Sequence, residues 1–331
     1  MTDDLSAPPT LTAHCPDDLL AMVPLVIGFT PEDSVVMLTF AARRAFHARV
    51  DLPPPERPDL LDDLSDALLE PAERHGVRLV AFVVHTEDAD LARRAAAVLV
   101  AAFTGSGIEV IDALHADGLR WRPAVGQRAG LPADGVPYDV SEHRFAAQAV
   151  VAGRVVHGTR AELARSVAAD PERVAAVSLA LEEPPVGPVA RGDWRAVAVW
   201  VRGTIAHHIE HRTVPSDAEA ASILLAITTV RVRDAAWHLM LDAPVDQHVE
   251  LWTDLVRRAP AALLAAPASL LGVAAWLAGH GALAWCAVDR CREHHPDYSL
   301  ARLVEDALQQ AMPPETMSGG WHWEDGLDAS A

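Results

Sequence analysis

The chain has 331 residues, half of them apolar, and a formal net charge of −19. This length allows two domains with sizeable cores, and the acidic balance disfavours nucleic acid and anionic membranes as partners, because both require a basic surface. All 27 basic residues are arginine. The lack of lysine excludes Schiff-base enzymes, standard P-loop nucleotide binding and the ion pair of protein kinases.

The cysteine content and the N-terminus predict a cytoplasmic protein. The three cysteines, Cys15, Cys286 and Cys291, are too few and too scattered for a disulfide framework. The N-terminus lacks the basic start and apolar core of a signal peptide, and we expect residues 1–12 to be disordered. Prolines and glycines interrupt the apolar stretch 259–288, which favours two short buried helices over a membrane span.

The N-terminal part alternates helical and strand-like patterns, so we expect an α/β domain over residues 13–140. In chain order the patterns predict a helix at 17–26, strands at 34–40 and 46–52, a helix at 58–75, a strand at 77–84, a helix at 88–103 and strands at 108–114 and 119–121. The apolar run 77–84 is typical of a strand buried on both faces, and Asp117-Gly118 is typical of a hairpin turn. This order predicts a mixed sheet with helices packed on it, followed by a loop over 122–139.

From residue 141 onward the patterns predict an all-helical domain, residues 141–312. The expected helices lie at 141–151, 160–168, 171–181, 194–211, 217–228, 232–241, 246–258, 268–278, 282–294 and 300–310. Ser216 and Glu219 have the spacing of a capping box. Residues 262–312 approximate a single tetratricopeptide repeat (TPR), which predicts a TPR-like helical hairpin and no repeat array. The acidic tail, 313–331, is predicted to be disordered.

Two sets of segments resemble a known family. The first is Val23–Ser34 (VPLVIGFTPEDS) with Arg49–Pro53 (RVDLP), and the second runs from Trp276–Gly279 (WLAG) through Pro296–Leu303 (PDYSLARL) to Pro313. Together they resemble an actinobacterial family catalogued as domain of unknown function 4192, over most of the chain. The resemblance implies no activity, because the family has none assigned.

The sharpest chemical motif is His207-His208-Ile209-Glu210-His211, which matches the H-x-x-E-H zinc signature of inverzincins. His207 and His211 share one helix face and could bind a metal, with Glu210 as a general base on bound water. Such a site also needs a downstream acidic ligand, which nothing in the sequence selects. The alternative is a histidine-rich face exposed to solvent.

A second candidate is Arg231–Trp237 (RVRDAAW), which resembles an arginine-aspartate-tryptophan stretch of the same family. Arg233 and Trp237 are four residues apart, so the guanidinium can stack on the indole, and Asp234 suits the first turn of a helix. Arg231, Arg233, Asp234 and Trp237 could hold a carboxylate, a phosphate or a partner. The alternative is a polar anchor between helices.

The tail and one turn complete the candidates. Trp321 and Trp323 could dock on a partner or pack on this chain's own helices. Gly28–Ser34 reads as a turn between a helix and a strand. Ser34 would need a histidine base to act as a nucleophile, and the sequence identifies none.

The sequence therefore favours a non-catalytic interaction or regulatory protein with a possible protein partner. The expected binding residues are Arg231, Arg233, Asp234, Trp237, Trp321 and Trp323. No catalytic residue and no cofactor are assigned. Two alternatives stay open, namely a zinc-dependent hydrolase that uses His207, Glu210 and His211, and a protein that binds a small acidic ligand at arginine side chains.

Overall fold

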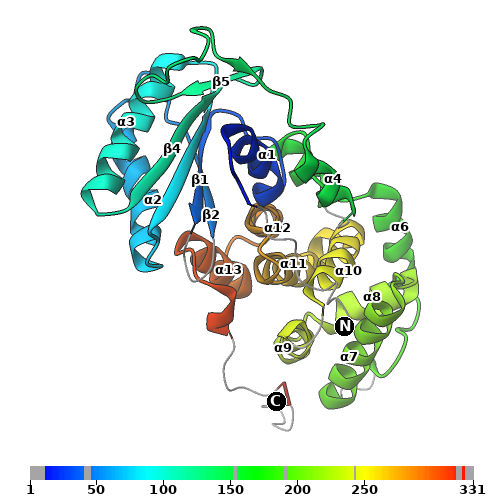
Figure 1. Cartoon of the computed structure of the whole chain (residues 1–331). Coiled ribbons are helices and arrows are strands. Elements are labelled where there is room, and N and C mark those ends of the chain that lie inside the picture. The colour runs from blue at the N-terminus through cyan, green and yellow to red at the C-terminus, as the bar shows by residue number, and fades with distance from the viewer. Residues whose placement is uncertain are drawn as a thin grey trace, which may run out of the picture. The chain divides into compact units, whose positions relative to one another are not determined.

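The computed structural model describes residues 12–40, 46–151, 155–189, 193–241, 244–317 and 323–324. The predicted disorder of 1–12 and of most of the tail therefore concerns residues that lie almost entirely outside this range. The chain divides into two compact units, residues 1–160 and 161–331, whose elements are labelled in Figure 1. This division falls beyond the expected boundary at 140, because α4 (Arg144–Val151) packs against α1 (Pro16–Ile27).

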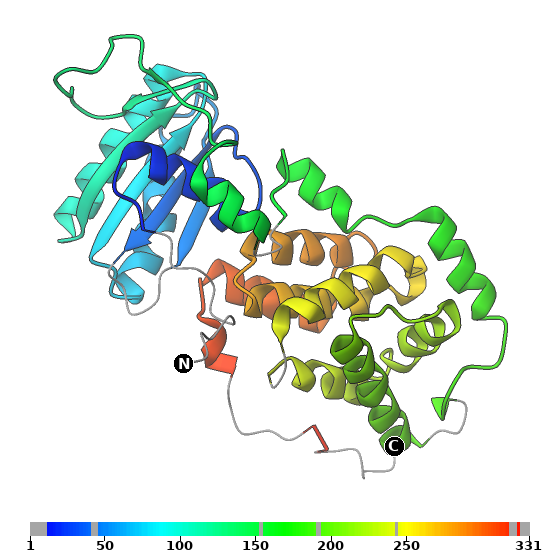
Figure 2. The same cartoon turned by 45° about the vertical axis from the view of Figure 1, so that its right-hand side comes forward.

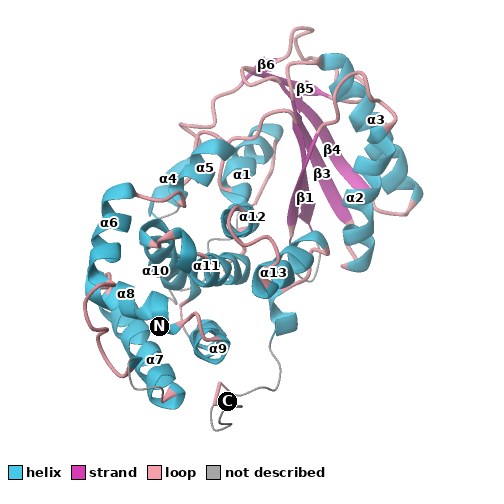
Figure 3. Cartoon of the chain, turned by 180° about the vertical axis from the view of Figure 1, so that it is seen from behind, coloured by secondary structure: helices cyan, strands magenta, loops and turns pink. Residues whose placement is uncertain are grey.

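The N-terminal unit is built on one mixed sheet of six strands, as predicted (Figure 3). The strands are β1 (Ser34–Phe40), β2 (His47–Asp51), β3 (Leu79–His85), β4 (Glu109–Ala116), β5 (Arg120–Pro123) and β6 (Val136–Pro137), in the spatial order β2-β1-β3-β4-β5-β6. Among the six strands described, β3 and β4 form the one parallel pair. The crossover between them contains α3 (Ala89–Gly105), as parallel strands require.

Alternation along the strands divides the apolar side chains between two layers. Val35 and Met37 face a core shared with α2 (Leu60–Arg74) and α3, whereas Val36 and Leu38 face a core shared with α1. Helices therefore cover both faces of the sheet (Figure 2). Residues 80–84 of β3 are fully buried, which confirms the strand that was expected to be buried on both faces.

The C-terminal unit is all-helical, as predicted. Its α-helices are α5 (Arg160–Ser166), whose first residue is the last of the N-terminal unit, α6 (Pro171–Ala180), α7 (Trp194–His211), α8 (Asp217–Ala226), α9 (Val230–His238), α10 (Val245–Arg258), α11 (Ala265–Leu277), α12 (Gly281–Arg292) and α13 (Ser299–Gln309). Short 3-10 helices lie at Leu239–Leu241, Ala261–Leu263 and Pro314–Met317. The capping box of Ser216 and Glu219 is present at the start of α8.

Helix α11 forms the centre of this unit, because α10, α12 and α13 all pack against it. Nearly every α11 side chain is buried, which explains why its sequence is apolar on all sides. Gly279, at φ +78°, separates α11 from α12, and the two helices together confirm the expectation for 259–288. Within the described residues, no helix is both long and apolar enough to cross a membrane. The likeness of this hairpin to a TPR stays a prediction.

Two short elements fall where the sequence predicted none. Strand β6 lies in the predicted loop 122–139 and pairs with Arg120 and Trp121 of β5. The 3-10 helix Pro314–Met317 lies in the tail that was expected to be disordered. The indole of Trp276 donates a hydrogen bond to the Met312 carbonyl (3.1 Å), so the start of the tail is attached to α11.

Candidate functional site

The H-x-x-E-H motif lies in the last turns of α7, and helical phase divides its histidines into two groups. His207 and His211 are exposed, with ring centroids 4.3 Å apart, and a ring nitrogen of His211 lies 2.9 Å from the His207 carbonyl oxygen. Glu210 is also exposed. Among the described residues, no group of three or more His, Cys, Asp or Glu side chains is arranged to hold a metal. Zinc binding by His207, Glu210 and His211 thus stays a prediction that lacks a third ligand in this part of the chain.

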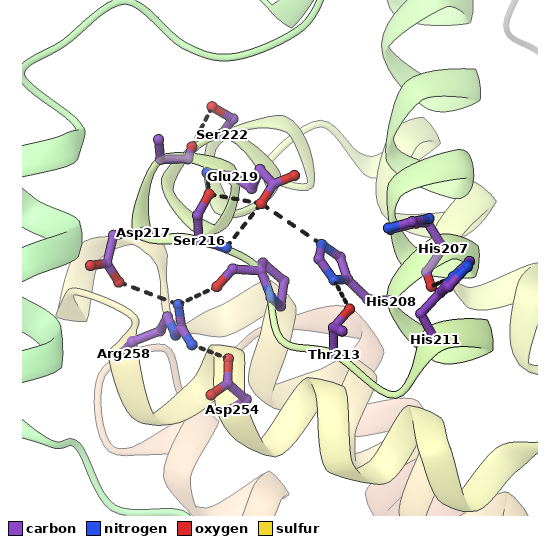
Figure 4. A network of polar contacts seen from close by, with 12 residues as sticks. His207, His208, His211, Thr213, Ser216, Asp217, Glu219, Ser222, Asp254 and Arg258 are labelled. Atoms are coloured by element: carbon purple, nitrogen blue, oxygen red, sulfur yellow. Dashed lines mark hydrogen bonds and ion pairs between the residues drawn. The ribbon is translucent and has the colours of Figure 1, made fainter.

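His208, which the motif leaves as a spacer, points into the unit instead (Figure 4). Its Nδ1 lies 2.8 Å from the Thr213 hydroxyl, and its Nε2 lies 3.8 Å from a carboxylate oxygen of Glu219. Burial lowers the pKa of His208 although Glu219 opposes this shift, and hydrogen bonds from Ser216 lower the pKa of Glu219. A neutral imidazole and a carboxylate therefore join the end of α7 to the start of α8.

A buried arginine completes the polar network in Figure 4. Arg258 is only 3% exposed. It donates to the Pro215 carbonyl (2.9 Å) and forms ion pairs with Asp254 (2.5 Å) and Asp217 (3.3 Å). Arg173 of α6 pairs with the other oxygen of Asp254. These bonds join α6, α8 and α10, so this network ties three helices of the helical unit to one another.

Arg233, the central residue of the Arg231–Trp237 candidate, is 5% exposed on α9. Its Nε and Nη2 donate to Asp234 (2.9 and 2.7 Å), and its Nη1 donates to the Tyr298 hydroxyl (3.0 Å). The guanidinium also lies 5.5 Å from the centroid of the Tyr298 ring. These contacts match the polar anchor between helices, one of the two alternatives. Ligand binding by Arg231, Arg233, Asp234 and Trp237 stays a prediction.

Beyond its start, the tail contacts the helical unit at residues 323 and 324. The indole of Trp323 lies over the Arg202 guanidinium, 4.5 Å from the ring centroid, and Glu324 forms an ion pair with Arg195 (3.3 Å). Both arginines belong to α7. Trp321, the other predicted tail residue, lies outside the described residues.

A polar cluster that the sequence did not reveal lies in the N-terminal unit, at the edge of the sheet where β3 and β4 end. Ser34 is the direct cross-strand partner of His85 on β3, and Arg49 of β2 is the partner of Val36, two residues further along β1. Because opposed residues and residues two apart share a face of a sheet, Ser34, Arg49 and His85 lie on one face. We call these three residues the edge cluster. It supplies the histidine beside Ser34 that the sequence did not identify.

Burial and nearby charges determine the protonation state of His85 in the edge cluster. Burial, followed by the nearby His115 and Arg49, lowers the pKa of His85 to about 4, so its imidazole is neutral at pH 7. Arg49 pairs with Asp51 (2.5 Å). The only sequence signal was that the buried strand ends in a histidine, and its position opposite Ser34 depends on a pairing between distant segments.

Comparison with known proteins gives one match. A family model described as "Domain of unknown function (DUF4192)" matches residues 16–315, which include almost all of the helices and strands described above. No curated protein and no solved structure matches the chain. The match carries no information on the source organism, so an actinobacterial origin stays a prediction.

Proposed function

Because the chain belongs to the DUF4192 family, whose description names no activity, we propose its function from the geometry: a non-catalytic interaction or regulatory protein of the cytoplasm. Its helical unit docks acidic, tryptophan-containing segments on α7. One observation carries this proposal, namely that Trp323 and Glu324 of the chain's own tail already lie against Arg202 and Arg195 of that helix.

The docking surface is one face of α7. Arg195, Val199 and Arg202 have the i, i+4, i+7 spacing that places side chains on one side of a helix, and Val199 is 54% exposed between the two arginines. An acidic segment complements these guanidinium groups in a chain whose net charge is −19. We call Arg195, Val199 and Arg202 the α7 face.

The strength of the contact suits a displaceable tail. An exposed ion pair contributes about 0–1 kcal/mol and a cation–π contact near the surface about 0.5–1 kcal/mol, so the tail alone binds weakly. Because the tail belongs to the same chain, its effective concentration at this surface is about millimolar. A partner with a similar acidic, aromatic segment can therefore compete with the tail for the α7 face.

The Arg231–Trp237 stretch of α9 contacts α7 and positions one residue of the α7 face. Arg202 donates from Nη1 to the carbonyl of Ala235 (2.8 Å), which lies in the middle of α9. Arg233 in turn fixes α9 through Asp234 and Tyr298. In this proposal the Arg231–Trp237 stretch positions Arg202. Arg233 and Asp234, which were predicted to bind a partner directly, therefore affect binding through Arg202.

The test uses a labelled peptide of residues 318–331 and measures its fluorescence anisotropy with four full-length chains. In the chain with Trp323→Ala, the chain's own tail binds the α7 face more weakly. We therefore expect this chain to bind the peptide more tightly than the unaltered chain does. Adding Arg202→Ala should weaken that binding about fivefold, the value of one lost cation–π contact. Arg165→Ala is the matched control, because Arg165 is another exposed helical arginine with only a local ion pair. Absence of saturable binding to the Trp323→Ala chain would refute the proposal.

A further inference from the structure

The edge cluster lies where ligands commonly bind in sheets of this kind. Ser34 begins β1, His85 ends β3, and Arg49 lies near the end of β2. This is also the edge at which the parallel strands β3 and β4 have their carboxyl ends, since Ala116 of β4 is the partner of His85. Carboxyl ends of parallel strands are the usual location of binding sites in α/β proteins.

Each member of the edge cluster has a buried polar atom without a partner in the described part of the chain. These atoms are the hydroxyl of Ser34, Nε of Arg49 and Nε2 of His85. Ser34 is fully buried, and His85 is more than nine-tenths buried. Native structures rarely leave buried polar atoms unpaired, because each one loses its hydrogen bonds to water. Three such atoms on one face of the sheet indicate a bound group that completes them.

Hydrogen-bonding capacity restricts what this group can be. The Nε of an arginine can only donate, whereas a hydroxyl and a neutral imidazole can donate or accept. The bound group must therefore offer an acceptor oxygen to Arg49. Hydroxyl groups meet all three requirements, since they both accept and donate.

Charge restricts it further. The Arg49 guanidinium is already neutralised by Asp51, and Asp33 lies at the same edge, held by the Thr86 hydroxyl (2.8 Å). Helix α1 ends at Ile27, a few residues before Asp33 in the chain, and the C-terminal end of a helix carries partial negative charge. These negative charges would repel an anion, and the guanidinium of Arg49 would repel a cation. A neutral ligand suffers neither repulsion.

Residues 28–33 cover the cluster on the side of Arg49. The Phe29 ring lies 5.5 Å from the guanidinium, and the Glu32 carbonyl accepts a hydrogen bond from it (3.4 Å). Gly28 (φ +86°) and Asp33 (φ +37°) bound this segment. Asp33 has a left-handed conformation, which aspartate adopts more readily than most other non-glycine residues. Backbone hydrogen bonds between this segment and His157 (2.9 and 3.1 Å) hold it over the cluster.

We infer that the edge cluster is a binding site for a neutral small molecule with several hydroxyl groups, such as a polyol or a sugar, over which residues 28–33 close. Ser34 and His85 each exchange a hydrogen bond with a ligand hydroxyl, and Arg49 donates to a ligand oxygen. Because Ser34 is fully buried, the ligand enters when residues 28–33 lift from Arg49. This inference concerns the N-terminal unit and does not depend on docking at α7.

The test is saturation-transfer NMR on the full-length chain with glycerol, myo-inositol and glucose as neutral probes and acetate as the anionic probe. We expect at least one neutral probe, and not acetate, to receive saturation. Ser34→Ala should weaken the binding of that probe about fivefold, the value of one lost hydrogen bond. The matched control is Ser65→Ala, because Ser65 is equally buried, also lacks a partner for its hydroxyl and lies on α2.

Four results would each overturn the inference. They are the absence of saturation for all three neutral probes at millimolar concentration, binding of acetate that Ser34→Ala removes, equal effects of the two serine substitutions, and a crystal structure soaked with the probes in which only ordered water bonds to Ser34, Arg49 and His85.

Discussion

Arg258→Met should destabilise the helical unit far more than the same substitution at the neighbouring Arg257. Arg258 is 3% exposed and donates to the Pro215 carbonyl as well as to Asp254 and Asp217. Arg257 has a side chain that is 41% exposed, and its nearest carboxylate is 3.6 Å away. Methionine keeps most of the volume of the side chain and removes only its charge and its donors.

The magnitude follows from what each substitution leaves behind. Without Arg258, the buried Asp254 keeps only Arg173 as a partner, and the Pro215 carbonyl loses its donor. Removal of one partner of a buried ion pair costs about 3–5 kcal/mol when the remaining charge is left uncompensated. Because Asp254 keeps Arg173, we expect the lower end of this range, about 3 kcal/mol. Loss of the exposed Arg257 pair costs about 0–1 kcal/mol.

Urea unfolding followed by tryptophan fluorescence can measure this difference. Of the nine tryptophans in the chain, only Trp121 lies in the N-terminal unit, so the signal reports almost entirely on the helical unit. We expect a difference of about 3 kcal/mol between the variants, and Asp254→Asn should recover part of the loss in the Arg258→Met chain. If the two methionine variants unfold at the same urea concentration, the network does not hold the helices together.

Three further predictions concern other parts of the helical unit. Burial lowers the pKa of His248 to about 4 in the folded chain, whereas its value in the unfolded chain is about 6.5. The folded state therefore loses stability as the pH falls from 6.5 towards 4. His248→Leu should make this loss about 3 kcal/mol smaller, as measured by urea unfolding at both pH values. Gly187 has φ +77°, and a Cβ there would lie 2.6 Å from an atom of the Trp200 indole, so Gly187→Ala should lower the free energy of unfolding by about 2 kcal/mol. Gly203 lies in a helix with no atom within 4 Å of a Cβ, so Gly203→Ala should raise the free energy of unfolding by about 0.5–1 kcal/mol. Thermal melts compare the two variants. Metal analysis of the untagged chain should find no stoichiometric zinc; a one-to-one zinc content that the double substitution His207→Ala/His211→Ala removes would establish the metal site that the hydrolase alternative requires.

Local patterns were sufficient to predict the helices and most strands. The apolar period of 3.6 residues and the caps act within a few residues of sequence, so Trp194–His211 has the same bounds in the sequence analysis and in the structure. The same holds for Ser34–Phe40. Strand β6 was missed because it has two residues and exists only through its pairing with β5.

The candidate sites were harder to predict because their partners are distant in the sequence. Tyr298 lies 65 residues from the arginine that it binds, and no spacing rule connects the two. The edge cluster depends on the pairing of β1 with β3 and β2. A sequence motif can select residue types, but burial and register decide which of them lack a partner.

The arrangement around α9 explains why one stretch can affect a distant surface. Arg233 fixes α9 to Tyr298 at the start of α13, and the Ala235 carbonyl on the same helix holds Arg202 of α7. A substitution at Arg233 would therefore move the acceptor of Arg202 as well as leave Asp234 without its main partner. Loss of peptide binding in such a variant would not show that Arg233 contacts the peptide. A substitution at an exposed position of α7, such as Arg195, separates recognition from support, because Arg202 is partly buried and also donates to the Ala235 carbonyl.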